Sequence, residues 1–444
     1  MDGALLARIR EAGVVGAGGA GFPTAVKLDS KPEYILINSV ECEPLIQVDQ
    51  QLAALYTPQF LETLDKLVKE SGAKGGVFAV KKKYAAAHEA LTKEIEKYPN
   101  LSIKALISSY PMGDEQVLVY EVLKRIVPEG GIPLNVGALV MNPETLLNIR
   151  QALEGQPVTD KYITVTGAVK KPATFKVPLG LPYSALIRAA GGALTENPVI
   201  IDGGPMMGKV QRNLDAPVIK TSKAVIVLPE DHPVVRSQDC SIERMLKLAR
   251  AACCHCAMCS DVCPRSLLGH SLYPDKLMRL ASYNSTCEKE TTAASAYLCC
   301  ECRLCEYACV MGLQPWRLNR ELKQRLRNAG IKYTGCIPKK VHDFREYRKY
   351  PTDKLVRQLG LAEYYHIPAP LLEYTESIAA VSLPLKQHFG APAKALAAPG
   401  DMVRKGDKIA AMEEGALGAD LHASIDGKVH SVDADQIVIK KEQI

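Results

Sequence analysis

The sequence predicts an α/β protein that is built from several domains. Three observations support this: the 444 residues exceed the ~100–200 of a typical domain, strands alternate with helices in the first third, and two cysteine-rich runs separate that part from a β-rich C-terminus. We expect domains over residues 1–155, 158–231, 232–335 and 381–444, with residues 336–380 as a linker.

The first domain carries helix and strand signals in alternation. Apolar runs predict buried strands at Tyr34–Val40, Gly76–Val80 and Ile103–Ser108. Helical patterns occur at Ala4–Ala12, Pro58–Ser71 and Ala85–Tyr98. Strands and helices of this length in alternation favour a mostly parallel, Rossmann-like sheet covered on both faces.

The remaining domains differ in their predicted secondary structure. Residues 158–231 contain short β-rich pieces punctuated by Gly and Pro, with a helix at Tyr183–Ala190, which predicts a small α+β module. Residues 232–335 are helical around the cysteine runs, with helices expected at Ile242–Ala252, Pro274–Ser282 and Arg317–Asn328. From Ser382 onward, short strands around Gly-Asp turns indicate an all-β domain.

Composition narrows the possible functions. The net charge of +6 is spread along the chain without a basic tract, so nucleic acid is not an expected partner. No apolar run approaches the ~20 residues of a transmembrane helix, and the N-terminus lacks a signal-peptide core. Ten of the 14 cysteines lie in residues 253–263 and 299–309, which is typical of metal ligands and fits a reducing cytoplasm.

Eight of these cysteines form two C-x-x-C-x-x-C-x-x-x-C runs. Thiolates are soft ligands that match iron, and a [4Fe-4S] cube needs four of them around a small volume. Because the fourth cysteine of such a run commonly ligates the other cube, we predict two [4Fe-4S] clusters with crossed ligands. Cluster one is assigned to Cys253, Cys256, Cys259 and Cys309. Cluster two is assigned to Cys299, Cys302, Cys305 and Cys263.

Zinc is the alternative occupant, since paired C-x-x-C elements also build tetrahedral zinc sites. Two complete runs of identical spacing favour iron. Pro264 follows the first run, whereas Val310 stands where a proline is expected after the second. Cys254 and Cys300 directly follow the first ligand of each run and are not counted as ligands.

A glycine-rich segment near the N-terminus satisfies G-x-G-x-x-G with Gly16, Gly18 and Gly21. A dinucleotide fingerprint requires a strand before the loop, but here the strand comes after it, so this match is weak. Glycines without Cβ atoms still permit close backbone approach to a flat ring or a phosphate. Lys27 adds a nearby positive charge, and Asn38 and Glu43 lie at or just beyond the C-terminal end of the first strand, at the sheet edge where such folds bind ligands.

Four segments together resemble a known family: GAGGAGFPTAVK (16–27), NSVECEP (38–44), YPMGDE (110–115) and VMNPET (140–145). They are similar to the flavin- and NADH-binding subunit of respiratory complex I and its diverged relatives, the RnfC proteins of Rnf electron-transport complexes and the cobalamin reductases of propanediol utilisation. Residues 161–229 resemble the family's β-grasp (SLBB) module, and residues 383–410 its barrel-sandwich segment. That segment is C-terminal here, an order that favours the cobalamin reductase branch.

The resemblance implies a set of cofactor contacts. The residues implied to surround FMN are Gly16, Gly18, Lys27, Asn38, Tyr110, Gly113, Asp114, Asn142 and Thr145. Those implied to face the nicotinamide nucleotide are Gly19, Phe22, Glu43 and Glu115.

The function implied is an NADH-dependent reductase that converts cob(III)alamin or cob(II)alamin to cob(I)alamin. Its expected place is the bacterial cytoplasm, in or at a propanediol-utilisation microcompartment, with shell proteins and cobalamin or a cobalamin-handling adenosyltransferase as partners. Two alternatives stay open: an RnfC-type protein of an electron-transport complex, and a ferredoxin-like relay without NADH activity. The helix within Met1–Gly13 is expected to pack on the flavin domain rather than to act as an encapsulation peptide.

The C-terminal domain offers two further patterns. It resembles a biotinyl or lipoyl carrier, but its turn MEEGALGAD (412–420) lacks a lysine to be modified, which favours an interaction module. Asp420-Leu-His422 matches the start of a cobalamin-binding D-x-H-x-x-G, but Ile425 occupies the glycine position.

Overall fold

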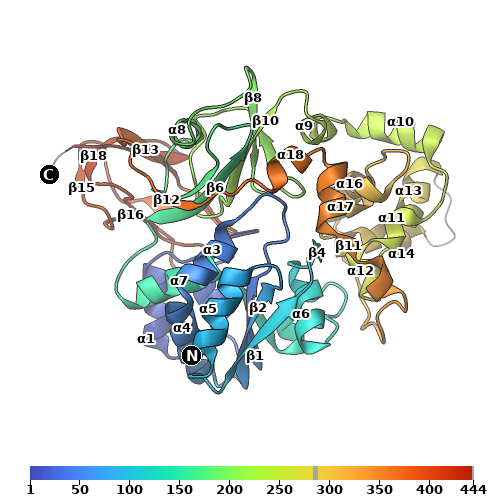
Figure 1. Ribbon diagram of the computed structural model, residues 1–444, viewed down its shortest axis with the longest axis horizontal. Helices are drawn as coiled ribbons and strands as arrows, with labels where there is room; N and C mark the ends of the chain where they lie inside the picture. The colour runs from blue at the N-terminus through green and yellow to red at the C-terminus, as the bar shows by residue number, and fades with distance from the viewer. Residues whose placement is uncertain (284–288, 443–444) are drawn as a thin grey trace.

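The computed structural model describes residues 1–283 and 289–442. Its parts are arranged side by side in Figure 1: the N-terminal α/β domain below, a β module above it, a helical domain at the right and a second β domain at the left. The two cysteine runs therefore lie at the opposite end of the molecule from the C-terminus.

The N-terminal domain is built on a parallel sheet with the strand order β3-β2-β1-β5. The strands are β1 (Tyr34–Ser39), β2 (Gly75–Lys81), β3 (Leu101–Leu106) and β5 (Ala138–Met141). Alternate residues of β1 face opposite layers: Ile35 and Ile37 pack with α4 (Thr57–Ser71), whereas Leu36 packs with α6 (Glu115–Leu123). Both faces are therefore covered, as the continuous apolar strands predict.

Several helices complete the covering layers. On the α4 side lie α3 (Val48–Leu55), α5 (Ala85–Ile95) and α7 (Pro143–Leu153). The first helix, α1 (Gly3–Glu11), is capped by the Asp2 side chain and packs against α7. Because Leu5, Leu6 and Ile9 are buried there, the N-terminal helix docks on this domain, as expected from its amphipathic pattern.

The β module contains a six-stranded sheet with the order β12-β7-β6-β10-β8-β9. Its consecutive strands are β6 (Asp160–Gly167), β7 (Ala173–Pro178), β8 (Pro198–Asp202), β9 (Lys209–Gln211) and β10 (Ala224–Pro229). Helix α8 (Tyr183–Ala189) packs on one face. The edge strand β12 (Leu371–Glu373) arrives from far along the chain and pairs in parallel with β7.

The helical domain surrounds the cysteine runs. Its helices include α9 (Pro233–Gln238), α10 (Ile242–Ala252), α11 (Met258–Asp261), α12 (Pro264–Leu267), α13 (Pro274–Tyr283), α14 (Lys289–Ala294), α15 (Leu304–Ala308) and α16 (Pro315–Asn328). No helix in the described ranges is long and apolar enough to cross a bilayer.

Residues 336–380 connect the helical domain to the C-terminal domain, and they contain more regular structure than the sequence pattern indicated. They include α17 (Thr352–Gln358), α18 (Ala362–Tyr365) and the strand β11 (Tyr350–Pro351). Strand β11 pairs with β4 (Ser109–Tyr110) of the first domain, so this connection crosses back over the α/β domain. These elements are too short to give a clear hydrophobic period.

The C-terminal domain consists of two small antiparallel sheets. One has the order β13-β19-β18-β15, formed by β13 (Ala380–Pro384), β19 (Gln436–Lys440), β18 (Gly427–Val432) and β15 (Met402–Val403). The other joins β14 (Lys394–Ala395), β16 (Lys408–Ala411) and β17 (Leu421–His422).

Candidate cofactor sites

The glycine loop lies between α1 and α2 (Thr24–Leu28). Its conformation is held by Gly16 N–H, which donates to the Phe22 carbonyl at 3.0 Å, and by Ala17 N–H, which donates to Thr145 Oγ1 at 2.9 Å. A Cβ atom added at Gly19, whose φ is +64°, would meet nothing within 4 Å. The loop therefore presents bare backbone to an open space, where a ligand can approach closely.

Side chains from distant elements converge beside this loop. Asn38 Nδ2 at the end of β1 donates to the Gly113 carbonyl at 2.9 Å, and Asn142 Nδ2 after β5 donates to the Asn38 carbonyl at 3.3 Å. Lys27 forms an ion pair with Glu115 at 3.2 Å. Residues that are far apart in the sequence thus share one edge of the sheet, the carboxyl edge.

These residues suit a phosphorylated ligand with a polar, flat ring. Backbone N–H groups and the Lys27 ammonium can hold a phosphate, and the Asn38 and Asn142 amides can bond to a ring edge. Gly18 lies close to the second amide, because a Cβ atom added there would be 3.6 Å from Asn142 Oδ1. The donor set fits FMN.

Two predicted flavin residues reach toward the helical domain. The Asp114 carboxylate caps α6 by accepting from Gln116 N–H and Val117 N–H, and it accepts from both terminal nitrogens of Arg265 at 2.6 and 2.9 Å. The Tyr110 hydroxyl donates to the Cys302 carbonyl at 2.9 Å. Burial alone would raise the pKa of Asp114, but the Arg265 guanidinium lowers it below its ordinary value.

The predicted nucleotide residues Glu43 and Phe22 contact the two β domains. The Glu43 carboxylate accepts from Met206 N–H and Met207 N–H at 2.9 Å each, and burial raises the pKa of this group to about 7. The Phe22 ring stacks on Phe389 with centroids 5.9 Å apart. That these residues bind a nucleotide stays a prediction.

The cysteines assigned to cluster two line one small cavity. Cys263, Cys299, Cys302 and Cys305 all contribute to its wall. Burial raises the pKa of the Cys263 thiol to about 12, so this side chain would stay protonated unless a bound metal displaces the proton. A buried set of four thiols at one cavity fits an iron–sulfur cube.

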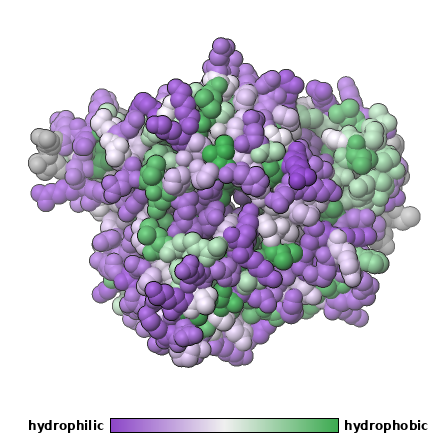
Figure 2. All heavy atoms as spheres, viewed as in Figure 1, coloured by the Kyte–Doolittle hydropathy of each residue, from purple (hydrophilic) through white to green (hydrophobic). Residues whose placement is uncertain are grey.

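The cysteines assigned to cluster one are more open to solvent. The Cys259 thiol has Cys309 and Cys253 as its cysteine neighbours, and burial raises its pKa to about 12. Cys256 is exposed, as is the nearby Cys254. Figure 2 shows a pale green, apolar area at the right-hand end, where Figure 1 places α10, α11 and α13. Leu248 of α10 and Met258 of α11 are exposed apolar residues.

The two runs share a backbone conformation as well as a spacing. In each run, the residues just before and just after the second cysteine adopt left-handed φ angles: His255 and Ala257 in the first, Glu301 and Arg303 in the second. Such turns point successive N–H groups inward and build an anion-binding concavity. Among the described residues, no three His, Cys, Asp or Glu side chains are grouped as they would be around a single metal ion.

Sequence reasoning missed the residues that join these sites. Arg265 and Arg303 line the cluster-two cavity together with Trp316, and the Arg303 guanidinium lies 4.6 Å from the Trp316 ring. A lone arginine beside a cysteine run carries no sequence signal of its own. The loop that holds Glu43 did carry a sequence signal, the glycine-rich stretch GGPMMG (203–208). Glycine is needed there because a Cβ atom at Gly204 would lie 2.1 Å from Glu43 Oε2.

Comparison with known proteins finds a related domain in each of four parts of the chain. Four family models match it: the Nuo51 FMN-binding domain over residues 9–151, the SLBB domain over 162–210, a 4Fe-4S dicluster domain over 252–314 and the RnfC barrel sandwich hybrid domain over 371–443. The predicted fold class is therefore confirmed: a multidomain α/β protein with these four modules. The ligand of each individual cysteine and the flavin contacts stay predictions.

Whole-length relatives are similar as well. The cobalamin reductase PduS of Salmonella typhimurium is 40% identical over 434 residues, which cover 97% of this chain and 95% of the relative. A component of the Na(+)-translocating ferredoxin:NAD(+) oxidoreductase complex of Acetobacterium woodii is 33% identical over 262 residues, 58% of this chain and 56% of the relative. An NAD+-reducing [NiFe]-hydrogenase chain of known structure is 21% identical, with a TM-score of 0.48 over 82% of this chain and 68% of that chain.

Proposed function

The chain belongs to the family of the cobalamin reductase PduS, and on that basis we propose that it is an NADH-dependent reductase of cobalamin. In this reaction NADH is oxidised to NAD+ and a proton, and its two electrons take cob(III)alamin through cob(II)alamin to cob(I)alamin. Bound FMN would supply the exchange between a two-electron donor and one-electron acceptors.

The observation that carries this proposal is the direct contact between the predicted flavin residues and the cluster-two cysteines. Tyr110 bonds to the Cys302 backbone, and Asp114 pairs with Arg265, which closely follows Cys263. The Tyr110 contact is buried and the Asp114–Arg265 pair is largely buried, so these contacts fix the separation of the two sites. Electron transfer between centres requires such a fixed, short separation.

The other residues have supporting roles in this proposal. The glycine loop, Lys27, Asn38 and Asn142 hold and orient the flavin. Arg265 places a positive charge beside cluster two, which favours its reduced form. Cluster one lies under the exposed surface around Cys256, where electrons can leave the protein.

A second candidate function is that of an RnfC-type component of an electron-transport complex, which the Acetobacterium woodii relative supports over part of the chain. In the first candidate the protein acts by itself in the cytoplasm or in a propanediol-utilisation microcompartment, next to an adenosyltransferase that consumes cob(I)alamin. In the second it needs a membrane complex. A relay without NADH activity is the third possibility.

One anaerobic experiment separates the three. Purified protein is assayed for flavin, iron and zinc, then mixed with NADH and hydroxocobalamin without membranes while visible spectra are recorded. The proposal expects bound FMN, iron at about eight per chain as two cubes require, NADH-driven cluster bleaching, and the cob(II)alamin spectrum followed by that of cob(I)alamin. Bleaching without cobalamin reduction would favour the RnfC-type role, absence of flavin and of bleaching would favour the relay, and zinc in place of iron would refute all three.

A further inference from the structure

A pocket of about 450 Å³ lies at the carboxyl ends of β1 and β2, apart from the glycine loop. One wall comes from the α/β domain, through the segment after β1 and through Lys81, Lys83 and Tyr84 after β2. The other wall is formed by Thr352, Asp353 and residues 365–368 of the connection between domains. Among the predicted site residues, only Glu43 contributes to it. Its volume is within the range of small-molecule sites.

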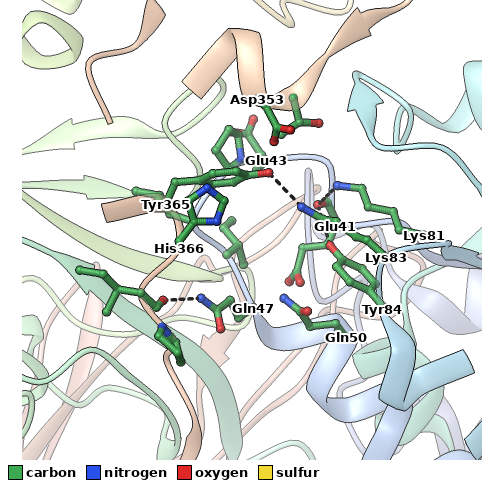
Figure 3. A pocket seen from close by; sticks show the side chains of 16 residues that line it. Glu41, Glu43, Gln47, Gln50, Lys81, Lys83, Tyr84, Asp353, Tyr365 and His366 are labelled. Atoms are coloured by element: carbon green, nitrogen blue, oxygen red, sulfur yellow. Dashed lines mark hydrogen bonds between the residues drawn. The ribbon is translucent and has the colours of Figure 1, made fainter. Parts of the chain in front are cut away.

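Two ring side chains face polar groups across this pocket. In Figure 3, Tyr365 and His366 lie on one side, and Tyr84 and Gln50 lie on the other. Segment 365–369 is held in place by Lys83, whose ammonium donates to the Tyr365 hydroxyl at 2.9 Å, and by Gln47, which bonds to the Ile367 carbonyl and the Ala369 N–H. The Tyr365 ring is therefore held at its hydroxyl and the backbone on the far side of His366 is anchored, which suits a flat ligand.

The polar groups of the pocket are only partly satisfied within the described residues. Glu41 Oε2 is buried and has no hydrogen-bond partner there. The buried Lys81 ammonium donates to the Glu41 carbonyl at 3.0 Å. Burial raises the pKa of Glu41 to about 7 and lowers that of Lys81 to about 8, so near neutral pH Glu41 is partly protonated, whereas Lys81 keeps most of its charge. The buried Glu41 Oε2 can accept a hydrogen bond, so this lining suits a ligand that carries hydrogen-bond donors such as amide N–H groups.

The pocket is also next to the cluster-two cavity. Glu43 lies in the pocket wall, and its carboxylate interacts with Tyr110 and with Arg303. Tyr110 bonds to the Cys302 backbone, and Arg303 lines the cluster-two cavity. One layer of side chains therefore separates a ligand in this pocket from a predicted electron carrier.

We propose that this pocket docks the corrinoid substrate, an inference that rests on the proposed function. A corrinoid is a flat macrocycle fringed with neutral amides, which matches the ring faces of Tyr365 and His366 and the groups at Glu41 and Gln50. The whole molecule is larger than the pocket, so one edge of the macrocycle enters. The other candidate, His422 in the C-terminal domain, is only 4% exposed, so its imidazole is closed to a macrocycle.

The test uses the holoprotein, oxidised and without NADH, titrated with hydroxocobalamin and followed by difference absorbance and by equilibrium dialysis. The double variant Gln50→Ala/His366→Ala removes two side chains that face the ligand. Tyr347→Ala is the matched control, since Tyr347 is 88% exposed on the same connection but outside the pocket. We expect the double variant to bind at least tenfold more weakly, with iron content, flavin content and NADH-driven bleaching as in the wild type. The control should bind normally.

Equal binding by the double variant and the wild type would overturn the proposal, as would displacement of hydroxocobalamin by NAD+, which would make this pocket part of the nucleotide site. If the wild type reduces hydroxocobalamin and the double variant reduces it at the same KM, the docking site is elsewhere and the proposed function still holds. If the wild type neither binds nor reduces it, the proposed function itself fails.

Discussion

Cys263 belongs to the first cysteine run in sequence but lies with the second run in space. It shares a cavity wall with Cys299, Cys302 and Cys305, whereas Cys309 is a neighbour of Cys259. We therefore expect Cys263→Ala and Cys305→Ala to remove the same cluster, with a loss of about half the iron. The electron paramagnetic resonance spectra of the two reduced variants should coincide.

The complementary variants sharpen this prediction. Cys259→Ala and Cys309→Ala should share a different spectrum, that of the remaining cluster two. Cys254→Ala, which changes a cysteine that is not counted as a ligand, should keep all the iron. If Cys263→Ala instead resembled Cys259→Ala, each run would hold its own cluster and the crossed assignment would be wrong.

Arg265 ties the helical domain to the α/β domain through a buried ion pair with Asp114. In Arg265→Gln the carboxylate stays buried without its cation, so we expect the free energy of unfolding to fall by about 3 kcal/mol. The pKa of Asp114 is lowered in the folded state, so the stabilisation by the wild-type pair is complete above the unfolded carboxyl pKa of about 3.9. This stabilisation is lost as the pH falls through the lowered pKa of Asp114 in the folded state.

Denaturant unfolding from neutral pH down to the acid range measures this effect. Arg325→Gln is a suitable control, because Arg325 pairs with Glu321 on the exposed surface of α16 and should contribute less than about 0.5 kcal/mol. Equal effects of the two substitutions would show that the contact between the domains does not depend on the Arg265 pair.

At the scale of an element, the glycine loop combines two different requirements for glycine. Gly19 and Gly21 both have left-handed φ angles, of +64° and +65°. A Cβ atom at Gly19 would point into open space, whereas one at Gly21 would lie 2.6 Å from Thr221 Cγ2 and 3.2 Å from the His388 Cα atom. Gly19 is therefore needed on the ligand side, and Gly21 is needed for packing between domains.

Alanine substitutions should separate these requirements. Both should cost about 1–2 kcal/mol through the left-handed backbone, but only Gly21→Ala adds a clash and should lower the melting temperature further. Relative to its loss of stability, Gly19→Ala should release more flavin during gel filtration than Gly21→Ala. A larger flavin loss from Gly21→Ala at equal stability would place the ligand on the other side of the loop.

The elements themselves show what the sequence could predict. Strand β1 was predicted within one residue of its observed end because Tyr34–Val40 is a largely apolar run. The cysteine runs and the glycine loop were found by spacing alone. By contrast, β12 could not be predicted, because an edge strand of three residues forms only through its tertiary partner β7. The pocket between Tyr84 and His366 joins segments far apart in the chain, which no local pattern reports.

At the scale of the whole molecule, the domains converge on shared contacts. Lys220 of the β module donates to the Gly13 carbonyl of the α/β domain and to the Asp420 carbonyl of the C-terminal domain, at 2.7 Å each. Segment 387–389 of the C-terminal domain then reaches the glycine loop, where Phe389 N–H donates to the Gly21 carbonyl at 3.2 Å. The C-terminal domain therefore borders the predicted nucleotide site, although it is far from it in sequence.

This arrangement predicts a role for Phe389 in nucleotide binding. Its ring stacks on Phe22, which is predicted to face the nicotinamide nucleotide, and an aromatic pair contributes about 0.5–1.5 kcal/mol. We expect Phe389→Ala to raise the KM for NADH about two- to tenfold, the factor that this energy corresponds to, with the iron content and the dithionite-reduced cluster spectra unchanged. Leu396→Ala, at another exposed apolar position of the same domain, should leave that KM as it is. An unchanged KM in Phe389→Ala would mean that the C-terminal domain only supports the loop and does not contribute to the nucleotide site.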